Sequence, residues 1–183
     1  ATTAGKKFQV YAKMGLVSQV FDEESLSRLT GTIAIGHNRY STRGSNRSSN
    51  VQPMIVGNGS NAFAIAHNGN ITNAESLYQE LAGLGYAFRT STDTEVIANL
   101  ILSSPEKDWL SKIRYAMHRL SGAYSLTIMT SHSLFGVRDP LGVRPLCLGT
   151  INSNAWVLAS ESCALDHIGA RFVREVEPGE IVS

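Results

Sequence analysis

Short apolar runs at both ends of the chain flank a middle part in which apolar residues recur at helical spacing. Short apolar runs bounded by turn residues are typical of strands, whereas a spacing of three to four residues is typical of helices. The pattern therefore predicts strands, then helices, then strands again. Strands are predicted at 8–11, 32–37, 54–56, 62–66, 123–129, 134–137, 145–149 and 155–159, and helices at 23–29, 72–84, 109–120 and from 91–95 onward.

Local residue chemistry supports two of the predicted helix starts. Asp22 is placed to cap the helix at 23–29, because its side chain can accept a hydrogen bond from the first turn. The residues at 72–75 fit a capping box for the next helix. The buried stripe of that helix is expected at Leu77, Leu81 and Leu84.

This order of elements lacks strict alternation of strand and helix. It predicts an α+β protein whose helices pack on a largely antiparallel sheet. A length of 183 residues fits one domain, expected to span 1–183. The hydrophobic fraction of 43% supplies a sizeable core and argues against disorder.

Composition excludes several classes of function. The net charge of +1, without a basic run, argues against a nucleic-acid partner. No apolar run approaches the roughly 20 residues that cross a bilayer, so no membrane contact is expected. Cys147 and Cys163 have no metal-ligand spacing and are expected to be reduced thiols in a cytoplasmic protein without a metal site.

Arg39 and Thr42 follow the predicted strand at 32–37 and should lie at its rim. An arginine there can bind a carboxylate through two parallel hydrogen bonds. The alternative is a solvated arginine followed by a Ser/Thr turn.

Asn68 and Gly69 follow a second apolar strand and precede a helix, where a hairpin turn would be out of place. The Asn68 amide and the Gly69 N–H could form an oxyanion hole. Asp93 could bind a substrate ammonium, or could simply belong to the first turn of a helix. His37 and His67 are expected to be packing or hydrogen-bonded residues rather than general bases.

Several motifs together resemble the glutamine amidotransferase domain of the N-terminal-nucleophile type. They are GHNRYSTRG at 36–44, QP at 52–53, AHNGN at 66–70 and TDTEVI at 92–97. The tail narrows the resemblance to the amidophosphoribosyltransferase family, through VRDPLGVRPL at 137–146, SESCALD at 160–166 and EPGE at 177–180.

The resemblance implies a four-layer α-β-β-α sandwich and hydrolysis of glutamine to glutamate and ammonia for 5-phosphoribosylamine synthesis in purine biosynthesis. Arg39 would bind the glutamine carboxylate, Asp93 its ammonium, and Thr42 would line the pocket. Asn68 and Gly69 would form the oxyanion hole. The nucleophile in this family is an N-terminal cysteine. Neither Cys147 nor Cys163 matches it, because neither is N-terminal.

The chain is therefore expected to be a fragment without its nucleophile and inactive as given. The resemblance also implies a phosphoribosyl domain in the same polypeptide, a homo-oligomer, Mg²⁺ and, in some members, a 4Fe-4S cluster in the C-terminal part. Two alternatives stay open. One is the same domain serving another acceptor, such as a sugar phosphate, and the other is an amino-acid-binding or regulatory module without a nucleophile.

Overall fold

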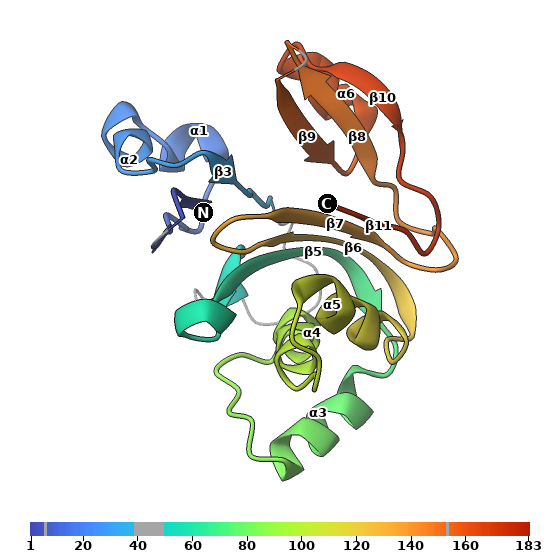
Figure 1. The fold of residues 1–183 in the computed structure, drawn as a ribbon. Helices are drawn as coiled ribbons and strands as arrows, with labels where there is room; N and C mark the ends of the chain where they lie inside the picture. The colour runs from blue at the N-terminus through green and yellow to red at the C-terminus, as the bar shows by residue number, and fades with distance from the viewer. Residues whose placement is uncertain (6, 39–49, 153) are drawn as a thin grey trace.

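The structure is a computed structural model that describes residues 1–5, 7–38, 50–152 and 154–183 (Figure 1). Its centre is a five-stranded sheet with the order β11-β7-β6-β5-β4, in which every neighbouring pair is antiparallel. The strands are β4 (Met54–Val56), β5 (Phe63–Ile71), β6 (Gly122–Met129), β7 (Leu134–Arg138) and β11 (Ile181–Val182).

Three helices cover one face of this central sheet (Figure 1). They are α3 (Ala74–Gly83), α4 (Asp93–Leu102) and α5 (Trp109–Met117). Phe63 and Ile65 of β5 point to this side and are fully buried in the main core. Most of α4 is buried as well, including three polar residues, Thr94, Glu95 and Asn99. The middle helix therefore fixes the position of its first residue, Asp93, against the sheet.

A second layer of strands covers the other face. Ala64 and Ala66 of β5 point to this side and pack with Ala1 and Ile35. The layer contains two three-stranded sheets, β2-β1-β3 and β10-β8-β9. Their strands are β1 (Thr2–Thr3), β2 (Phe8–Gln9), β3 (Ile33–Ala34), β8 (Cys147–Ile151), β9 (Ala155–Ala159) and β10 (Arg171–Glu175).

Helices complete the outer side of this second layer. Leu165 of α6 (Ser162–His167) packs with Cys147 and Ala170 against the β10-β8-β9 sheet. Two short helices, α1 (Val17–Val20) and α2 (Glu23–Ser27), lie between β2 and β3 in the chain, and a 3₁₀ turn at Gly59–Asn61 joins β4 to β5. The α+β sandwich expected from the sequence is confirmed.

Several local predictions are confirmed. Asp22 caps α2 by accepting a hydrogen bond from the Ser25 N–H at 2.7 Å. Leu77 and Leu81 are buried, and β8 pairs with β9 as a hairpin.

Other predictions are wrong in detail. The capping box predicted at 72–75 does not form. Thr72 Oγ1 donates to the Ser121 carbonyl, and the Asn73 side chain bonds the Arg119 carbonyl and the Ser121 N–H, so both residues tie the helix start to a distant loop. Leu84 follows the end of α3 and is 66% exposed, because the helix stops before it can turn that residue inward. The helix predicted at 109–120 ends at Met117. The strand predicted at 62–66 instead continues to Ile71. No helix in the described part of the chain is long and apolar enough to span a membrane.

Tyr124 offers a test of the core. Its side chain is fully buried, and its hydroxyl has no hydrogen-bond partner among the described residues. Burial and, to a smaller degree, the charge of Asp139 raise the pKa of Tyr124 from 10.0 to about 12. The folded state thus binds this proton more tightly than the unfolded chain does. Its contribution to stability is complete below pH 10 and is lost as the pH rises toward 12.

We therefore expect Tyr124→Phe to be stabilising by about 1 kcal/mol at pH 7, because it removes an unpaired buried hydroxyl. The advantage of the variant should grow by about 2 kcal/mol between pH 10 and pH 12. Urea denaturation across this range measures both effects. Tyr78→Phe, at an exposed position, is the control. A constant difference between wild type and Tyr124→Phe would contradict the raised pKa.

Candidate active site on strand β5

The candidate site is built on the second half of β5. Strand β4 is three residues long and pairs only with Phe63–Ile65 of β5. Strand β6 pairs with β5 as far as Ile71 on its other side. Beyond Ile65, none of the described strands covers this side of β5, which we call the free edge of β5.

Side chains from other elements satisfy part of this free edge. The His67 N–H donates to Gln52 Oε1 at 2.7 Å, and His37 Nε2 donates to the His67 carbonyl at 3.1 Å. Four residues along, the Ile71 N–H donates to Asp93 Oδ2 at 3.3 Å. Backbone groups of alternate residues in a strand point to the same side. The Gly69 N–H therefore faces the same free edge, between two N–H groups that are already bonded.

Gly69 is required here by close packing against β6. Its φ is 157°, and a Cβ at this position would collide with the Ala123 carbonyl oxygen and lie 2.8 Å from Tyr124 Cα. A side chain would push β5 away from its partner strand. Asn68 and Gly69 thus lie within β5. The sequence predicted correctly that they form no hairpin turn, but it placed them after the end of the strand.

Asn68 points to the opposite side of the central sheet from His67, since side chains alternate along a strand. Its amide Nδ2 donates to Ser160 Oγ at 3.3 Å. Ser160 lies between β9 and α6, so this contact joins the central sheet to the second layer. Sequence reasoning gave Ser160 no role, and no local pattern could have paired two residues 92 positions apart.

Asp93 lies at the first position of α4, directly after the capping residue Thr92. Asp93 Oδ1 is 3.5 Å from His67 Nδ1, while Oδ2 accepts the Ile71 N–H. Burial is the largest single influence on its pKa and raises it. Hydrogen bonding and charge from His67, together with the N–H groups of Ile71 and Thr94, outweigh burial and lower the pKa below its ordinary value. The carboxylate is ionised and, at 24% side-chain exposure, still reachable.

Three buried polar side chains next to Asp93 contact one another. Gln52 Nε2 donates to Thr94 Oγ1 at 3.0 Å, and His67 Nδ1 lies 3.3 Å from the same oxygen. Sequence reasoning noted the motifs that contain Gln52 and Thr94 but gave neither residue a role. A glutamine before a proline and a threonine at a helix start have no sequence signal for mutual contact.

Glu95 fixes the chain just before α4. Its buried carboxylate accepts hydrogen bonds from the N–H groups of Arg89 and Thr90 and from the Thr90 hydroxyl, at 2.7–3.1 Å. This set of bonds holds the turn that leads into Asp93.

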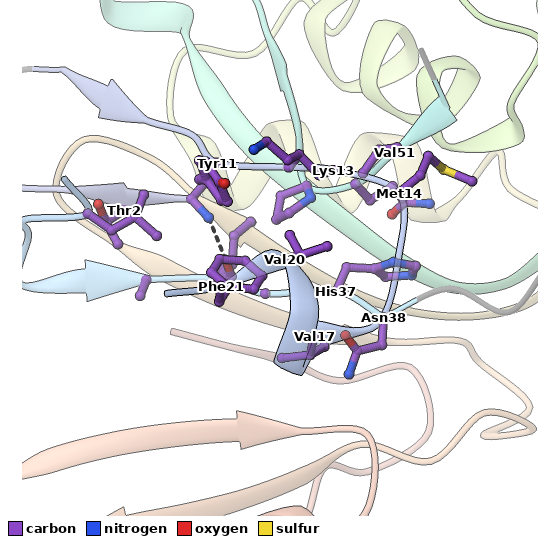
Figure 2. A pocket seen from close by; sticks show the side chains of 18 of the residues that line it. Thr2, Tyr11, Lys13, Met14, Val17, Val20, Phe21, His37, Asn38 and Val51 are labelled. Atoms are coloured by element: carbon purple, nitrogen blue, oxygen red, sulfur yellow. Dashed lines mark hydrogen bonds between the residues drawn. The ribbon is translucent and has the colours of Figure 1, made fainter. Parts of the chain in front are cut away.

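The structure brings Asn68, Gly69 and Asp93 together around β5. Arg39 and Thr42 lie outside the described residues. A cavity of about 510 Å³ lies nearby, with His37, Asn38 and Gln52 on its border. Figure 2 shows side chains of the N-terminal segment around the same cavity, including Val20 and Phe21.

The two cysteines lie in different surroundings. Cys147 is buried in β8, where burial raises the pKa of its thiol. Cys163 is exposed in α6, with its sulfur 3.8 Å from Glu161 Oε2. Neither residue is among the hydrogen-bond partners of Asn68, Gly69 or Asp93 described above. Within the described ranges, no three His, Cys, Asp or Glu side chains are grouped as metal ligands would be.

A family model described as a glutamine amidotransferase domain matches residues 37–167. The chain belongs to this family. The match spans the strand–helix core that carries Asn68, Gly69 and Asp93.

Curated relatives of this amidotransferase domain are amidophosphoribosyltransferases. The enzyme of Synechococcus elongatus is 47% identical over 187 residues, and that of Methanocaldococcus jannaschii is 46% identical over 184 residues. Both matches cover 100% of the chain but only 38% and 39% of the relatives. The chain thus spans about two-fifths of their length.

Two solved structures match this amidotransferase domain closely. One is a glutamine phosphoribosylpyrophosphate amidotransferase from B. subtilis complexed with ADP and GMP, with a TM-score of 0.91 at 42% identity. The other is an allosteric regulatory enzyme of purine biosynthesis, with a TM-score of 0.93 at 43% identity. Each match covers 98% of this chain and 39% of the other.

Gly69→Ala tests the close approach of β5 to β6. We expect a loss of about 3 kcal/mol in the free energy of unfolding, because the new methyl meets backbone atoms that cannot rotate away. Urea denaturation measures the loss. Gly83→Ala is the matched control: it lies in α3 with no atom within 4 Å of its added Cβ, and should stabilise by about 0.5–1 kcal/mol. Equal stability of the two variants would refute the packing argument.

Proposed function

We propose that this chain is the glutaminase domain of an amidophosphoribosyltransferase. It would hydrolyse glutamine to glutamate and ammonia, and the ammonia would serve 5-phosphoribosylamine synthesis in the larger protein. The single observation that carries the proposal is the arrangement on β5. An ionised carboxylate, Asp93, is bonded to the same free edge on which the Gly69 N–H lies.

Recognition of glutamine would use one charged side chain for its α-ammonium and another for its α-carboxylate. The partly exposed Asp93 carboxylate is suited to the α-ammonium, since the Ile71 N–H and His67 hold it in one orientation. Arg39 would bind the α-carboxylate, and Thr42 would line the pocket. These last two assignments rest on the motif at 36–44.

The Gly69 N–H and the Asn68 amide would stabilise the reaction at the side-chain carbonyl of glutamine. A thiolate adds to this carbon, and the carbonyl oxygen becomes negative. Donors fixed before the reaction stabilise such an oxygen without further reorganisation, and one of them is commonly worth about 10²–10³ in kcat. The oxyanion would replace Ser160 Oγ as the acceptor for the Asn68 amide.

The nucleophile is proposed to lie outside these 183 residues. Cys147 is buried with a raised pKa, and the polar side chain beside Cys163 is the carboxylate of Glu161 rather than an amine or imidazole that would activate the thiol. An attacking thiol would pass its proton to an amine base, and that proton would leave with the ammonia. Water would then cleave the thioester to give glutamate.

Other parts of the expected enzyme are also proposed to lie outside the chain. A 4Fe-4S cluster takes four thiolates, whereas this sequence has two cysteines, so its residues do not fit such a group. Mg²⁺ likewise finds no grouped acidic ligands within the described ranges. A phosphoribosyl domain, a homo-oligomer and a cytoplasmic location remain proposals for the full-length protein.

Asp93→Asn in the full-length protein tests ammonium recognition. We expect kcat/KM for glutamine to fall about 10–100-fold, as for the loss of a charged hydrogen bond. Turnover of 4-carbamoylbutanoate, which is glutamine without its α-amino group, should change little. The ratio of the two kcat/KM values would therefore fall by the same factor.

Asp108→Asn is the control for this test, because Asp108 caps α5 on the exposed surface. It should leave the ratio unchanged. If Asp93→Asn lowered kcat/KM equally for both substrates, Asp93 would stabilise the fold and would not bind the ammonium.

The proposed nucleophile gives a separate expectation. The 183-residue chain alone should release no glutamate above a buffer blank. In the full-length protein, Cys147→Ser and Cys163→Ser should each keep the rate per folded molecule within about twofold, since neither thiol attacks. Turnover by the chain alone, or loss of activity in a folded Cys163→Ser, would overturn this assignment. Glutamine binding without any turnover by the full-length protein would favour the binding-module alternative.

A further inference from the structure

His67 is a buried titratable residue that the proposed reaction does not use. Its side chain is 1% exposed and lies between β5 and the start of α4. Both its backbone groups are bonded at the free edge, through Gln52 and His37. The ring therefore has little freedom to move relative to β5.

The two ring nitrogens of His67 have different surroundings. Nδ1 lies 3.5 Å from Asp93 Oδ1 and 3.3 Å from Thr94 Oγ1. Nε2 is buried and has no partner in the described part of the chain. A lone pair on Nδ1 would face the Asp93 carboxylate, which is unfavourable. The ring proton therefore belongs on Nδ1, between the Asp93 carboxylate and Thr94 Oγ1.

Asp93 needs such a contact in order to keep one orientation. Its other oxygen accepts the Ile71 N–H at 3.3 Å, and the side chain is partly open to water. Without His67, the carboxylate could turn toward solvent and would lose rotational freedom only when glutamine binds. A carboxylate fixed in advance avoids that entropic cost.

We propose that His67 is a positioning residue, whose Nδ1–H holds the Asp93 carboxylate against the free edge of β5 so that it faces the α-ammonium of glutamine. The inference rests on the proposed function and names a residue that controls its specificity. His67 itself does not touch the substrate. Its effect is confined to the amino end of glutamine.

Two amide substitutions in the full-length protein separate the ring nitrogens. His67→Asn places an amide nitrogen where Nδ1 lies, and His67→Gln places one near Nε2. We expect His67→Gln to raise KM for glutamine about tenfold with kcat within about threefold, because a uniform binding contact is lost. His67→Asn should stay within about threefold of wild-type KM.

A second readout does not depend on how much of each variant is folded. The ratio of kcat/KM for glutamine to that for 4-carbamoylbutanoate cancels the concentration of active enzyme. This ratio should fall about tenfold in His67→Gln and stay near wild type in His67→Asn. A purely structural histidine would lower both rates and leave the ratio unchanged, which would overturn the inference.

Asp93→Asn is measured alongside as the reference. If Asp93→Asn lowers the ratio and His67→Gln does not, the positioning role of His67 is wrong and the proposed function is retained. If Asp93→Asn also leaves the ratio unchanged, the proposed ammonium site is wrong, and the positioning role that rests on it is wrong as well. Equal ratios in His67→Asn and His67→Gln would also contradict the role of Nδ1.

Discussion

The structure depends on the point at which β4 stops pairing with β5. Because β4 is three residues long, the backbone of β5 beyond Ile65 must find other partners on one side. Gln52 and Asp93 supply two of them from different parts of the chain. A buried strand edge is costly unless its groups are bonded. That constraint brings an ionised carboxylate and a glycine N–H to the same short length of strand.

Packing on both faces keeps this strand in place. Phe63 and Ile65 are buried in the core between the central sheet and the helices. Ala64 and Ala66, on the other face, are small enough to let the second layer approach. Helix α4 is buried along most of its length, so its first residue cannot shift without moving the core. Rigid elements rather than loops thus position Asp93, and such positioning suits a site that must hold a charge in one orientation.

The sequence predicted the fold well because its signals are local. Apolar runs and Asp22 required no knowledge of distant residues. The roles that the resemblance implies for Asn68, Gly69 and Asp93 stay predictions. The errors have non-local causes. Thr72 and Asn73 bond a loop 46–49 residues away instead of forming the predicted capping box, and β5 lengthens because β6 pairs with it to Ile71. The Gln52–Thr94–His67 contacts were missed for the same reason, since folding alone brings them together.

Two buried polar side chains close to the candidate site each have an atom without a hydrogen-bond partner among the described residues. In the described part of the chain, His67 Nε2 and the Tyr124 hydroxyl are both buried and unpaired. Tyr124 is the β6 residue opposite Gly69, and His67 Nε2 would lie 2.9 Å from a Cβ at Gly69. Unpaired buried groups lower stability. An apolar residue at position 67 would avoid this cost on β5, but it would also remove the Nδ1–H that we propose positions Asp93. Part of the cost in stability is therefore located at the residue to which the positioning role is assigned.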